Sequence, residues 1–461
     1  MRNLHYEKFA DGTVKCIEDE LPFEIPEGWA WDRLSNIAAF SSGKTPSTSH
    51  REFWDGNVLW VTSKDMKSKY ITSSLLMLSE KGASQMQLYP PETILMVTRS
   101  GILRHTLPVA ILKSEATANQ DIKAICLFDC SLAEWVYSCL KGMEDRLLLR
   151  YTKSGTTVEN INFDEFKDVL LPIPPVSEKN QIIDRVQGAC KAVDVIEKEK
   201  TALEDVVVKA KALILDLAIR GKLVPQDPDD EPASVLLERI RAEKEELIKQ
   251  GKIKRDKRES VIFRGEDNSY YEKDGEKVRC IDDLIPYDLP EGWIWLHGYS
   301  CFSGMETRRP SGTVFNYIDI DSIDNHAHAI TEPKHLPVHE APSRASRAVQ
   351  AGSVLFSLVR PYLQNIAFVP EKYSDCIAST GFYICNSNGL LLPEYMYYLM
   401  LSPYVVDGLN RFMKGDNSPS ISKDDIENWL FPVPPFAEQI RITSKIQHLI
   451  TQTDNIESAL A

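Results

Sequence analysis

Six residues, PEGWAW, stand at positions 26–31 and return as PEGWIW at positions 290–295, 264 residues later. Their upstream flanks also match, since HYEKFADGTVKCIEDELPFEI leads into the first copy and YYEKDGEKVRCIDDLIPYDL into the second. A second repeated segment follows downstream: SGTTVENINFDEFKDVLLPIPPVSEKNQI (154–182) matches KGDNSPSISKDDIENWLFPVPPFAEQIRI (414–442). The intervening blocks, about 32–153 and 296–413, share no evident similarity. Because the repeat is far longer than that of a solenoid, it predicts two copies of a whole domain plus a connector.

Composition places the chain among ordinary globular proteins. It has 461 residues, 43% of them hydrophobic and 26% charged, which allows about three domains. No apolar run approaches the ~18 residues of a membrane span, and MRNLHYEKFADG has no apolar leader core. Nine scattered cysteines without zinc-site spacing indicate free thiols in a reducing cytoplasm. The net charge of −14 argues weakly against nucleic acid, although an acidic protein can still present a basic face.

A long helix is predicted after the first proline pair. Ser177 is a suitable N-cap, and Arg220-Gly221 is a suitable end. Between them apolar residues alternate at spacings of four and three, with one lysine in the series: Ile182, Val186, Ala189, Val193, Ile196, Lys200, Leu203, Val207, Ala210, Ile214 and Leu217. The second copy keeps this frame: Ile442, Ile446, Leu449, Thr453, Ile456 and Leu460. Either the two helices pack antiparallel along this seam, or each covers its own domain.

These patterns predict a mixed α/β (α+β) fold in which two globular domains are joined by long antiparallel coiled-coil helices with an internal pseudo-two-fold repeat. The expected parts are a first domain (1–175), a central long helix (176–221), a charged connector (222–269), a second domain (270–435) and a C-terminal helix (436–461). The connector should contain a charged helix from Pro232 to about Gln250. Its basic run KIKRDKR (252–258) is either a solvated linker or a phosphate-binding strip.

The repeated segments, taken in their order along the chain and in two copies, resemble those of the specificity subunits of Type I restriction–modification systems. The resemblance covers nearly the whole chain and is carried by the paired PEGW-x-W segments, SSGKTPS (41–47), SGTTVENIN, the PIPP and PVPP stretches, Glu178 and Glu438, and GKLVPQDPDDEPASVLLERIRAEKE. It implies two target-recognition domains, each reading half of a split, asymmetric DNA sequence, with the helix pair as a ruler. It also implies two methyltransferase subunits and motor-nuclease subunits as partners. No catalysis is implied for this chain, so S-adenosylmethionine, ATP and Mg would belong to the partners.

Two features depart from the family pattern. Glu-Gln usually follows the proline pair; Gln439 follows Glu438, but Lys179 follows Glu178. The second helix is also shorter than the first. Its partner seam is therefore half-paired, or is completed by the short N-terminal stretch or by another chain.

Base reading requires forked donors and amides, and phosphate binding requires lysine, arginine, hydroxyl groups and loop amides. The candidates in the first block are Ser42, Lys44, Thr45, Ser47, Thr62, Ser63, Lys64, Lys67, Arg99, Ser100, Asn119, Gln120, Lys153 and Thr156. Those in the second block are Arg308, Arg309, Arg344, Arg347, Arg360, Tyr362, Gln364, Asn365, Lys414 and Asn417. Arg99 and Arg360 rank first, because each follows an apolar strand (TILMVTR, GSVLFSLVR). Trp29 and Trp293 are expected to anchor each domain to the scaffold rather than to stack on bases.

Other functions have weaker support in the sequence. A P-loop would need glycine where Ala38 precedes SSGKT, and the four histidines of HAHAITEPKHLPVH (326–339) match no zinc pattern. An amino-methylating DNA methyltransferase would need Asn or Asp before Pro-Pro-aromatic, where this chain has Val433, and no glycine-rich cofactor loop follows a strand. A two-domain interaction scaffold without DNA reading stays open as an alternative.

Overall fold

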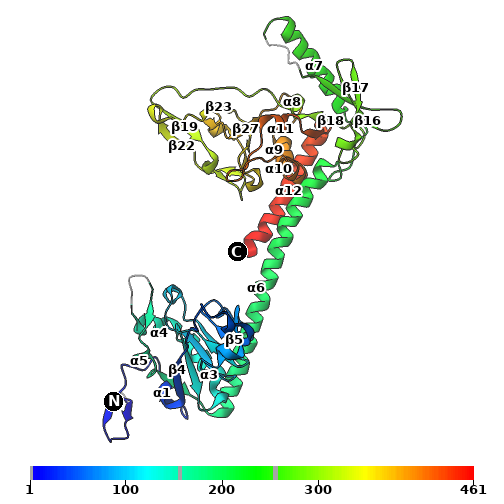
Figure 1. The fold of residues 1–461 in the computed structure, drawn as a ribbon. Coiled ribbons are helices and arrows are strands. Elements are labelled where there is room, and N and C mark those ends of the chain that lie inside the picture. The colour runs from blue at the N-terminus through cyan, green and yellow to red at the C-terminus, as the bar shows by residue number, and fades with distance from the viewer. Residues whose placement is uncertain (1–3, 154–157, 253–257, 461) are drawn as a thin grey trace. The chain divides into compact units, whose positions relative to one another are not determined.

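The computed structural model describes residues 4–153, 158–252 and 258–460. They form two compact units, Met1–Ile196 and Glu197–Ala461. Helices and strands alternate through both units, so the mixed α/β class is confirmed (Figure 1). Within the described residues, no helix is both long enough and apolar enough to cross a membrane.

Unit 1 is built on a five-stranded sheet of order β4-β11-β8-β9-β6 and a three-stranded sheet of order β10-β5-β7. Its strands and main helices are β1 (Tyr6–Lys8), β2 (Val14–Cys16), β3 (Ala30–Arg33), α1 (Leu34–Ile37), β4 (Ala38–Ser42), β5 (Trp54–Val61), β6 (Tyr70–Ile71), β7 (Leu76–Leu78), α2 (Glu80–Ala83), β8 (Ile94–Val97), β9 (Val109–Leu112), β10 (Ala116–Ala118), β11 (Ile122–Leu127), α3 (Ala133–Gly142), α4 (Glu144–Tyr151), β12 (Thr152–Lys153), β13 (Asn160–Ile161), α5 (Phe163–Phe166), β14 (Leu170–Ile173) and the start of α6 (Val176–Ile219).

The central strand β8 shows why the apolar run TILMV forms the middle of this unit. All four of its residues are buried. Because successive side chains point to opposite faces, Ile94 and Met96 join the core shared with α3 and α4, whereas Leu95 and Val97 join the core shared with β5 and β10. A strand that is covered on both faces has to be apolar throughout.

Unit 2 repeats this arrangement with a three-stranded sheet, β25-β24-β27, and a four-stranded sheet, β22-β19-β26-β23. Its elements are α7 (Ala233–Lys249), β15 (Ser260–Arg264), β16 (Tyr270–Asp274), β17 (Lys277–Cys280), β18 (Ile294–His297), α8 (Gly298–Cys301), β19 (Val314–Ile318), β20 (Ile323–Asp324), β21 (Ala329–Ile330), β22 (Lys334–Pro337), β23 (Ala345–Ala348), β24 (Val354–Ser357), β25 (Ile366–Phe368), β26 (Ile377–Ser379), β27 (Phe382–Cys385), α9 (Pro393–Leu401), α10 (Pro403–Asn410), α11 (Lys423–Glu427), β28 (Leu430–Val433) and α12 (Phe436–Leu460).

The same strand pairings occur inside each unit. In unit 1, β8 pairs antiparallel with β9 and β11, and β5 pairs antiparallel with β7 and parallel with β10. In unit 2, β24 pairs antiparallel with β25 and β27, and β19 pairs antiparallel with β22 and parallel with β26. The PEGW-x-W segments close each unit in one register, because β3 pairs with β14 as β18 pairs with β28. Blocks without evident sequence similarity therefore share one set of connections.

The long helix α6 runs without a break from Val176 to Ile219, a span of 44 residues. It ends as predicted, because Gly221 takes a left-handed φ of 64°. That turn lets the backbone N–H of Lys222 donate to the carbonyl of Leu217 at 2.8 Å, which closes the last helical turn. The predicted charged helix is also present as α7, between Pro232 and Gln250.

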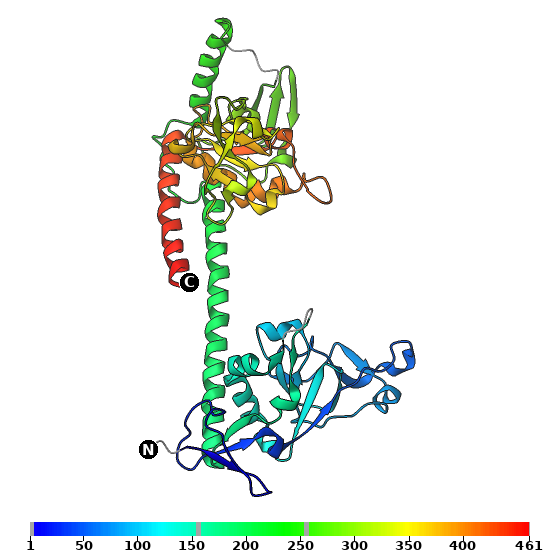
Figure 2. The ribbon, with the colours of Figure 1, turned by 90° about the vertical axis from the view of Figure 1, so that its left-hand side faces the viewer.

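Within unit 2, α12 lies beside the C-terminal part of α6 and runs in the opposite chain direction (Figures 1 and 2). Ile442 and Ile446 of α12 are fully buried in the same core as Leu215 and Ile219 of α6. Farther along, the Lys211 ammonium group lies 2.8 Å from a carboxylate oxygen of Asp454 and 2.7 Å from one of Glu457. The sequence frame therefore identifies the buried face at the start of α12.

The rest of the predicted seam differs from expectation. Val186, Val193 and Ile196 are 43%, 53% and 64% exposed. Ala189 is exposed too, Ile182 and Leu449 are half-buried, and Ile456 is 46% exposed. The buried apolar positions of α6 are Val207, which belongs to the predicted seam, and Leu215, Ala218 and Ile219, which do not. A heptad pattern identifies the apolar face of a helix, but only the part of that face that packs against another element is buried.

Ile446→Ala tests this division of the seam. Removing a fully buried side chain should lower the free energy of unfolding by about 2–5 kcal/mol. The matched control Ile456→Ala, at an exposed position in the same frame, should change it by less than about 0.5 kcal/mol. Urea unfolding of unit 2 provides the measurement, and equal losses for the two variants would contradict the assignment.

Candidate nucleic-acid interface

In unit 1, backbone hydrogen bonds bring several of the predicted loops to one end of the sheets. The N–H of Thr98, just after β8, donates to the carbonyl of Asp121 at 2.8 Å, and the N–H of Asn119 donates to the carbonyl of Val61, the last residue of β5, at 2.9 Å. The N–H of Lys44 donates to the carbonyl of Ala118 at 2.9 Å. The loops that carry Lys44, Lys64, Arg99 and Gln120 therefore start from neighbouring strand ends.

The SSGKTPS loop is held tightly against this edge. A Cβ atom on Gly43 would lie 2.1 Å from the carbonyl oxygen of Asn119, so only glycine permits the approach. The Thr45 hydroxyl donates to the side-chain carbonyl of Gln120, and the Trp60 indole donates to the carbonyl of Lys44 at 3.1 Å. With Gly43 in place, the exposed Lys44 and Thr45 are presented on a fixed backbone.

Arg99 is exposed and its backbone bridges to Asn160, which in turn pairs with Lys153 across β12 and β13. Arg99 and Lys153 thus lie on either side of Asn160. Asn160 was not among the predicted site residues, although it stands inside the repeated SGTTVENIN segment. Ser100 is half-buried and its hydroxyl accepts from the Ile102 N–H at 3.4 Å, so this hydroxyl already has a partner.

Thr62, Ser63 and Asn119 are half-buried, and the remaining described candidates of unit 1 are exposed: Ser42, Ser47, Lys64, Lys67 and Gln120. The Ser47 hydroxyl lies 2.7 Å from that of Ser49. Thr156 and most of the basic run KIKRDKR, residues 253–257, lie outside the described residues.

Unit 2 builds the corresponding end around Arg360, which follows β24. Arg360 donates from its guanidinium to the carbonyl of Asn417 at 3.0 Å, and its backbone N–H donates to Pro419 at 2.8 Å. Lys414 pairs with Ser420 on the same segment. Arg360 and Gln364 both hold left-handed φ angles, 47° and 53°, which bulky side chains adopt only when their surroundings impose them.

A hollow of about 450 Å³ opens beside this loop, lined by Asn325, Val359, Arg360, Leu363 and Ser418 among others. Asn365 also lines it but is only 7% exposed, so only a group that enters the hollow could reach this predicted base reader. Tyr362, in contrast, is 46% exposed. Asn325 was not predicted; its side chain donates to the carbonyl of Leu363 at 2.8 Å and has no sequence signal that distinguishes it.

The other unit 2 arginines lie at the adjoining strand ends. Arg308, Arg309 and Arg344 are exposed, and Arg347 is half-buried on β23. The carbonyl of Arg344 accepts from the Thr380 N–H at 2.9 Å, and that of Gly381 accepts from the Leu358 N–H at 2.8 Å. These bonds connect Arg344 with the loop of Arg360.

Arg99 and Arg360 each follow an apolar strand, β8 and β24, but they stand one position apart in the corresponding loops. The Ile161 N–H donates to the carbonyl of Thr98, and the Ile421 N–H donates to that of Leu358. In the next backbone hydrogen bond, the N–H of Ser100 donates to the carbonyl of Glu159 in unit 1, and the N–H of Arg360 donates to the carbonyl of Pro419 in unit 2. Arg360 therefore corresponds to Ser100, and Arg99 corresponds to Val359. Both arginines belong to the same loop, but they occupy successive positions in it.

Each unit is also fixed to the start of its long helix by a tryptophan. The indole N–H of Trp29 donates to Glu178 of α6 at 2.8 Å, and that of Trp293 donates to Glu438 of α12 at 2.8 Å. The predicted anchoring role of these tryptophans is confirmed. In unit 2 the contact is covered, because Gln226 of the connector donates to the same Glu438 at 2.7 Å. Burial raises the pKa of Glu438, although the bonds from Trp293 and Gln226 oppose the shift.

Lys179 performs the task that Gln439 performs in unit 2. Gln439 is fully buried and bonds the backbone of Leu390 and Leu392, at the start of α9. Lys179, only 3% exposed, donates to the carbonyl and the hydroxyl of Ser131 at 3.0 and 3.1 Å, just before α3. Both side chains tie a long helix to its own unit, so the departure from Glu-Gln keeps its structural purpose.

Comparison with known proteins agrees with this geometry. The family model described as the Type I restriction modification DNA specificity domain matches residues 26–205. The specificity subunit of the Type I restriction enzyme EcoAI of Escherichia coli is 25% identical over 95% of this chain and 80% of its own length. Residues 26–205 therefore belong to the family of Type I restriction modification DNA specificity domains, and the chain as a whole is similar to a Type I specificity subunit.

Two further matches cover parts of the chain. The EcoR124I/EcoR124II specificity subunit of Escherichia coli is 29% identical over 40% of this chain and 44% of its own length. The crystal structure of the HsdS subunit from Thermoanaerobacter tengcongensis is 35% identical over 38% of this chain and 46% of that chain, with a TM-score of 0.36. Both Escherichia coli relatives are described as specificity subunits of Type I restriction enzymes.

Replacing Lys179 tests the equivalence with Gln439. Lys179→Leu removes two hydrogen bonds that a buried, charged donor makes to the carbonyl and the hydroxyl of Ser131, and should cost about 1–3 kcal/mol of unit 1 stability. Lys179→Gln retains an amide donor and should cost less. Chemical denaturation compares them; if glutamine is as damaging as leucine, the equivalence fails.

Proposed function

We propose that this specificity subunit reads a bipartite, asymmetric DNA sequence, with one half of the target recognised by each unit. A single observation carries the proposal: both units end in the same set of strand-end loops, yet these loops present different side chains. A shared framework with different donors is what two readers of different sequences require. The shared pairings within each unit further support one ancestral recognition domain in two copies.

The five-part division into domains, helices and connector belongs to this proposal. The helices of 176–221 and 436–461 would form an antiparallel pair that sets the unread spacer and docks two methyltransferase subunits. Motor-nuclease subunits would join the complex for restriction. S-adenosylmethionine, ATP and Mg would be bound by those partners, since specificity subunits are non-catalytic components.

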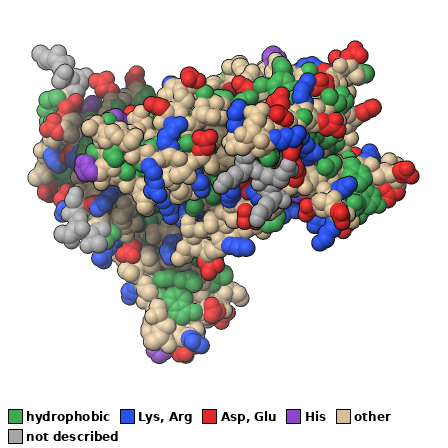
Figure 3. Space-filling view, turned by 90° about the horizontal axis from the view of Figure 1, so that it is seen from above, with side chains coloured by type: hydrophobic (Ala, Val, Ile, Leu, Met, Phe, Trp, Pro, Cys, Tyr) green, Lys and Arg blue, Asp and Glu red, His purple; other side chains and the backbone are tan. Residues whose placement is uncertain are grey.

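The proposed interface need not be strongly basic overall. In the space-filling view, Lys and Arg side chains are interspersed with Asp and Glu rather than gathered in one area (Figure 3). Local donors at Arg99, Lys153, Arg360 and Lys414 would supply phosphate and base contacts. The net charge of −14 fits a chain whose affinity depends on a few placed cations and on its partners.

A methyltransferase function is disfavoured by the place of the VPPF segment. Val433 is fully buried as the last residue of β28, where it pairs with Ile294. A residue in that position cannot hold a target amine, both because valine lacks an acceptor and because the position is inside the core. The interaction scaffold stays the alternative to DNA reading.

Arg99→Ala and Arg360→Ala serve as each other's controls. Each should relax the recognised sequence in one half of the target and leave the other half unchanged, at a cost of about 1–3 kcal/mol when a base contact is lost. Each chain, assembled with its methyltransferase partner, is used to select duplexes from a random pool, which are then sequenced. If both variants retain the wild-type sequence and affinity, the assignment of these loops is wrong. If both lose the same half, the division between units is wrong.

The purified chain should transfer no methyl group from radiolabelled S-adenosylmethionine to DNA, because catalysis belongs to its partners. The same assay with the methyltransferase subunit added supplies the positive control. Measurable turnover by the chain alone would overturn its non-catalytic role.

A further inference from the structure

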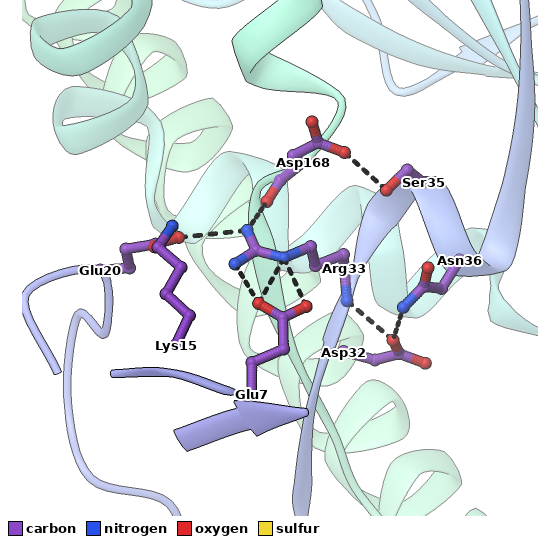
Figure 4. Close-up of polar contacts among 8 residues, drawn as sticks. All are labelled: Glu7, Lys15, Glu20, Asp32, Arg33, Ser35, Asn36 and Asp168. Atoms are coloured by element: carbon purple, nitrogen blue, oxygen red, sulfur yellow. Dashed lines mark hydrogen bonds and ion pairs between the residues drawn. The ribbon is translucent and has the colours of Figure 1, made fainter. Parts of the chain in front are cut away.

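An arginine docks the N-terminal hairpin of unit 1. Arg33, on β3, donates through Nε to both carboxylate oxygens of Glu7 on β1, at 2.7 and 2.9 Å (Figure 4). Its Nη1 donates to the carbonyl of Asp168 at 2.6 Å and to Glu20 at 3.1 Å. The bonds to Glu7 outweigh burial and raise the pKa of Arg33, so this guanidinium keeps its charge throughout the physiological range.

A histidine occupies the same place in unit 2. His297 pairs with Leu430 across β18 and β28, as Arg33 pairs with Leu170 across β3 and β14. Its Nε2 lies 3.0 Å from a carboxylate oxygen of Glu272 on β16, and its Nδ1 lies 2.8 Å from the carbonyl oxygen of Asn428. The partners correspond too, because Glu272 stands in the repeated YEK triplet, as Glu7 does.

Both ring nitrogens of His297 therefore face hydrogen-bond acceptors. A carbonyl oxygen can only accept, and a carboxylate can only accept. A neutral imidazole has one N–H and one lone pair, so in either tautomer one of these contacts would set a lone pair against an acceptor. Only the doubly protonated ring satisfies both, and His297 is 8% exposed, which leaves little room for water to replace a lost bond.

The surroundings of the ring keep Glu272 ionised. Burial opposes its charge, but the bonds from Arg279 and Ser260 and the charge of His297 prevail and lower the pKa of Glu272. Arg279, on β17, donates to Glu272 at 2.9 Å. Tyr299 stacks on His297 with ring centres 5.1 Å apart. Burial raises the pKa of this phenol; Glu272 and Asp274 add to the shift, whereas the bond with Ser260 and the charge of Arg258 oppose it.

We propose that a proton on His297 holds the β15–β16–β17 sheet on unit 2, which makes the attachment of this sheet sensitive to pH, whereas the Arg33 attachment in unit 1 is not. Since the protonated ring is the form that binds, the contribution is present at low pH and is lost as the pH rises and the ring deprotonates. Among side chains, histidine has the ordinary pKa nearest to neutrality, about 6.5. Glu272 and Tyr299 keep their charge states near neutral pH, because the pKa of the carboxyl is lowered and that of the phenol is raised.

Amide hydrogen exchange of the full chain tests this inference. Protection factors, corrected for the intrinsic effect of pH, are measured at about pH 6 and about pH 8.5. Amides of Ser260–Arg264 and Tyr270–Asp274 should lose about tenfold protection or more at the higher pH, in keeping with loss of a hydrogen bond to a charged group. Amides of Tyr6–Lys8 and Val14–Cys16 in unit 1 serve as the internal control and should change by less than about twofold.

Two variants separate the proton from other causes. His297→Arg installs the residue of unit 1 and should make protection of the sheet independent of pH. Glu272→Gln should do the same by another route, because a neutral imidazole can then donate to Asn428 and accept from the new amide. Unchanged protection in the wild-type sheet, or a pH dependence that survives in both variants, would overturn the proposal. If only one variant folds, its pH profile decides.

Discussion

The hydrogen bond from a tryptophan indole to a glutamate in the first turn of a long helix is the contact on which each half of this protein depends. It joins the turn before β3 or β18, at Trp29 or Trp293, to the helix that follows β14 or β28, at Glu178 or Glu438. The paired strands β3–β14 and β18–β28 bring these groups together from residues almost 150 positions apart. Each recognition unit is therefore closed at one end and joined to its helix there, which leaves the opposite loops free to differ.

The two copies of this junction are not identical. The bond to Glu438 is buried and shared with Gln226, whereas Glu178 is exposed and its partner Trp29 is half-buried. Lys179 and Gln439 reach the same kind of target with different chemistry, and so do Arg33 and His297. In each pair the geometry is retained and the side chain is exchanged, so the second unit depends on protonation or on neutral amides where the first unit uses fixed charge.

Much of this architecture could be predicted from the sequence. The duplicated PEGW-x-W and proline-rich segments predicted two domains with helices behind them, and Gly221 marked the end of the first helix because its left-handed φ favours glycine. The buried strands of TILMV and GSVLFSLV were evident from continuous apolar runs. The shared strand pairing of the two intervening blocks was not evident from the sequence. Strand pairing depends on buried shape and can persist after side-chain identity has diverged.

Other features could not be predicted from the sequence alone. Heptad spacing identified Ile442 and Ile446 as core, yet the same spacing at Val193 and Ile196 marks exposed positions, since burial requires a neighbour. Arg99 and Arg360 looked equivalent because each follows an apolar strand, but the register is fixed by bonds to distant segments. Asn365 looked like a surface amide and is nearly enclosed.

The central claim is that two different readers act on one DNA target. The most direct measurement is a map of methylated bases in the genome of a host without adenine methylation of its own, after expression of this chain with its methyltransferase partner. The account predicts a split motif with two different specified ends around a fixed unspecified gap. A palindromic split motif would contradict it by showing one unit acting in a symmetric pair, and an absence of methylation beside a partner that is active with another specificity subunit would contradict the reading function itself.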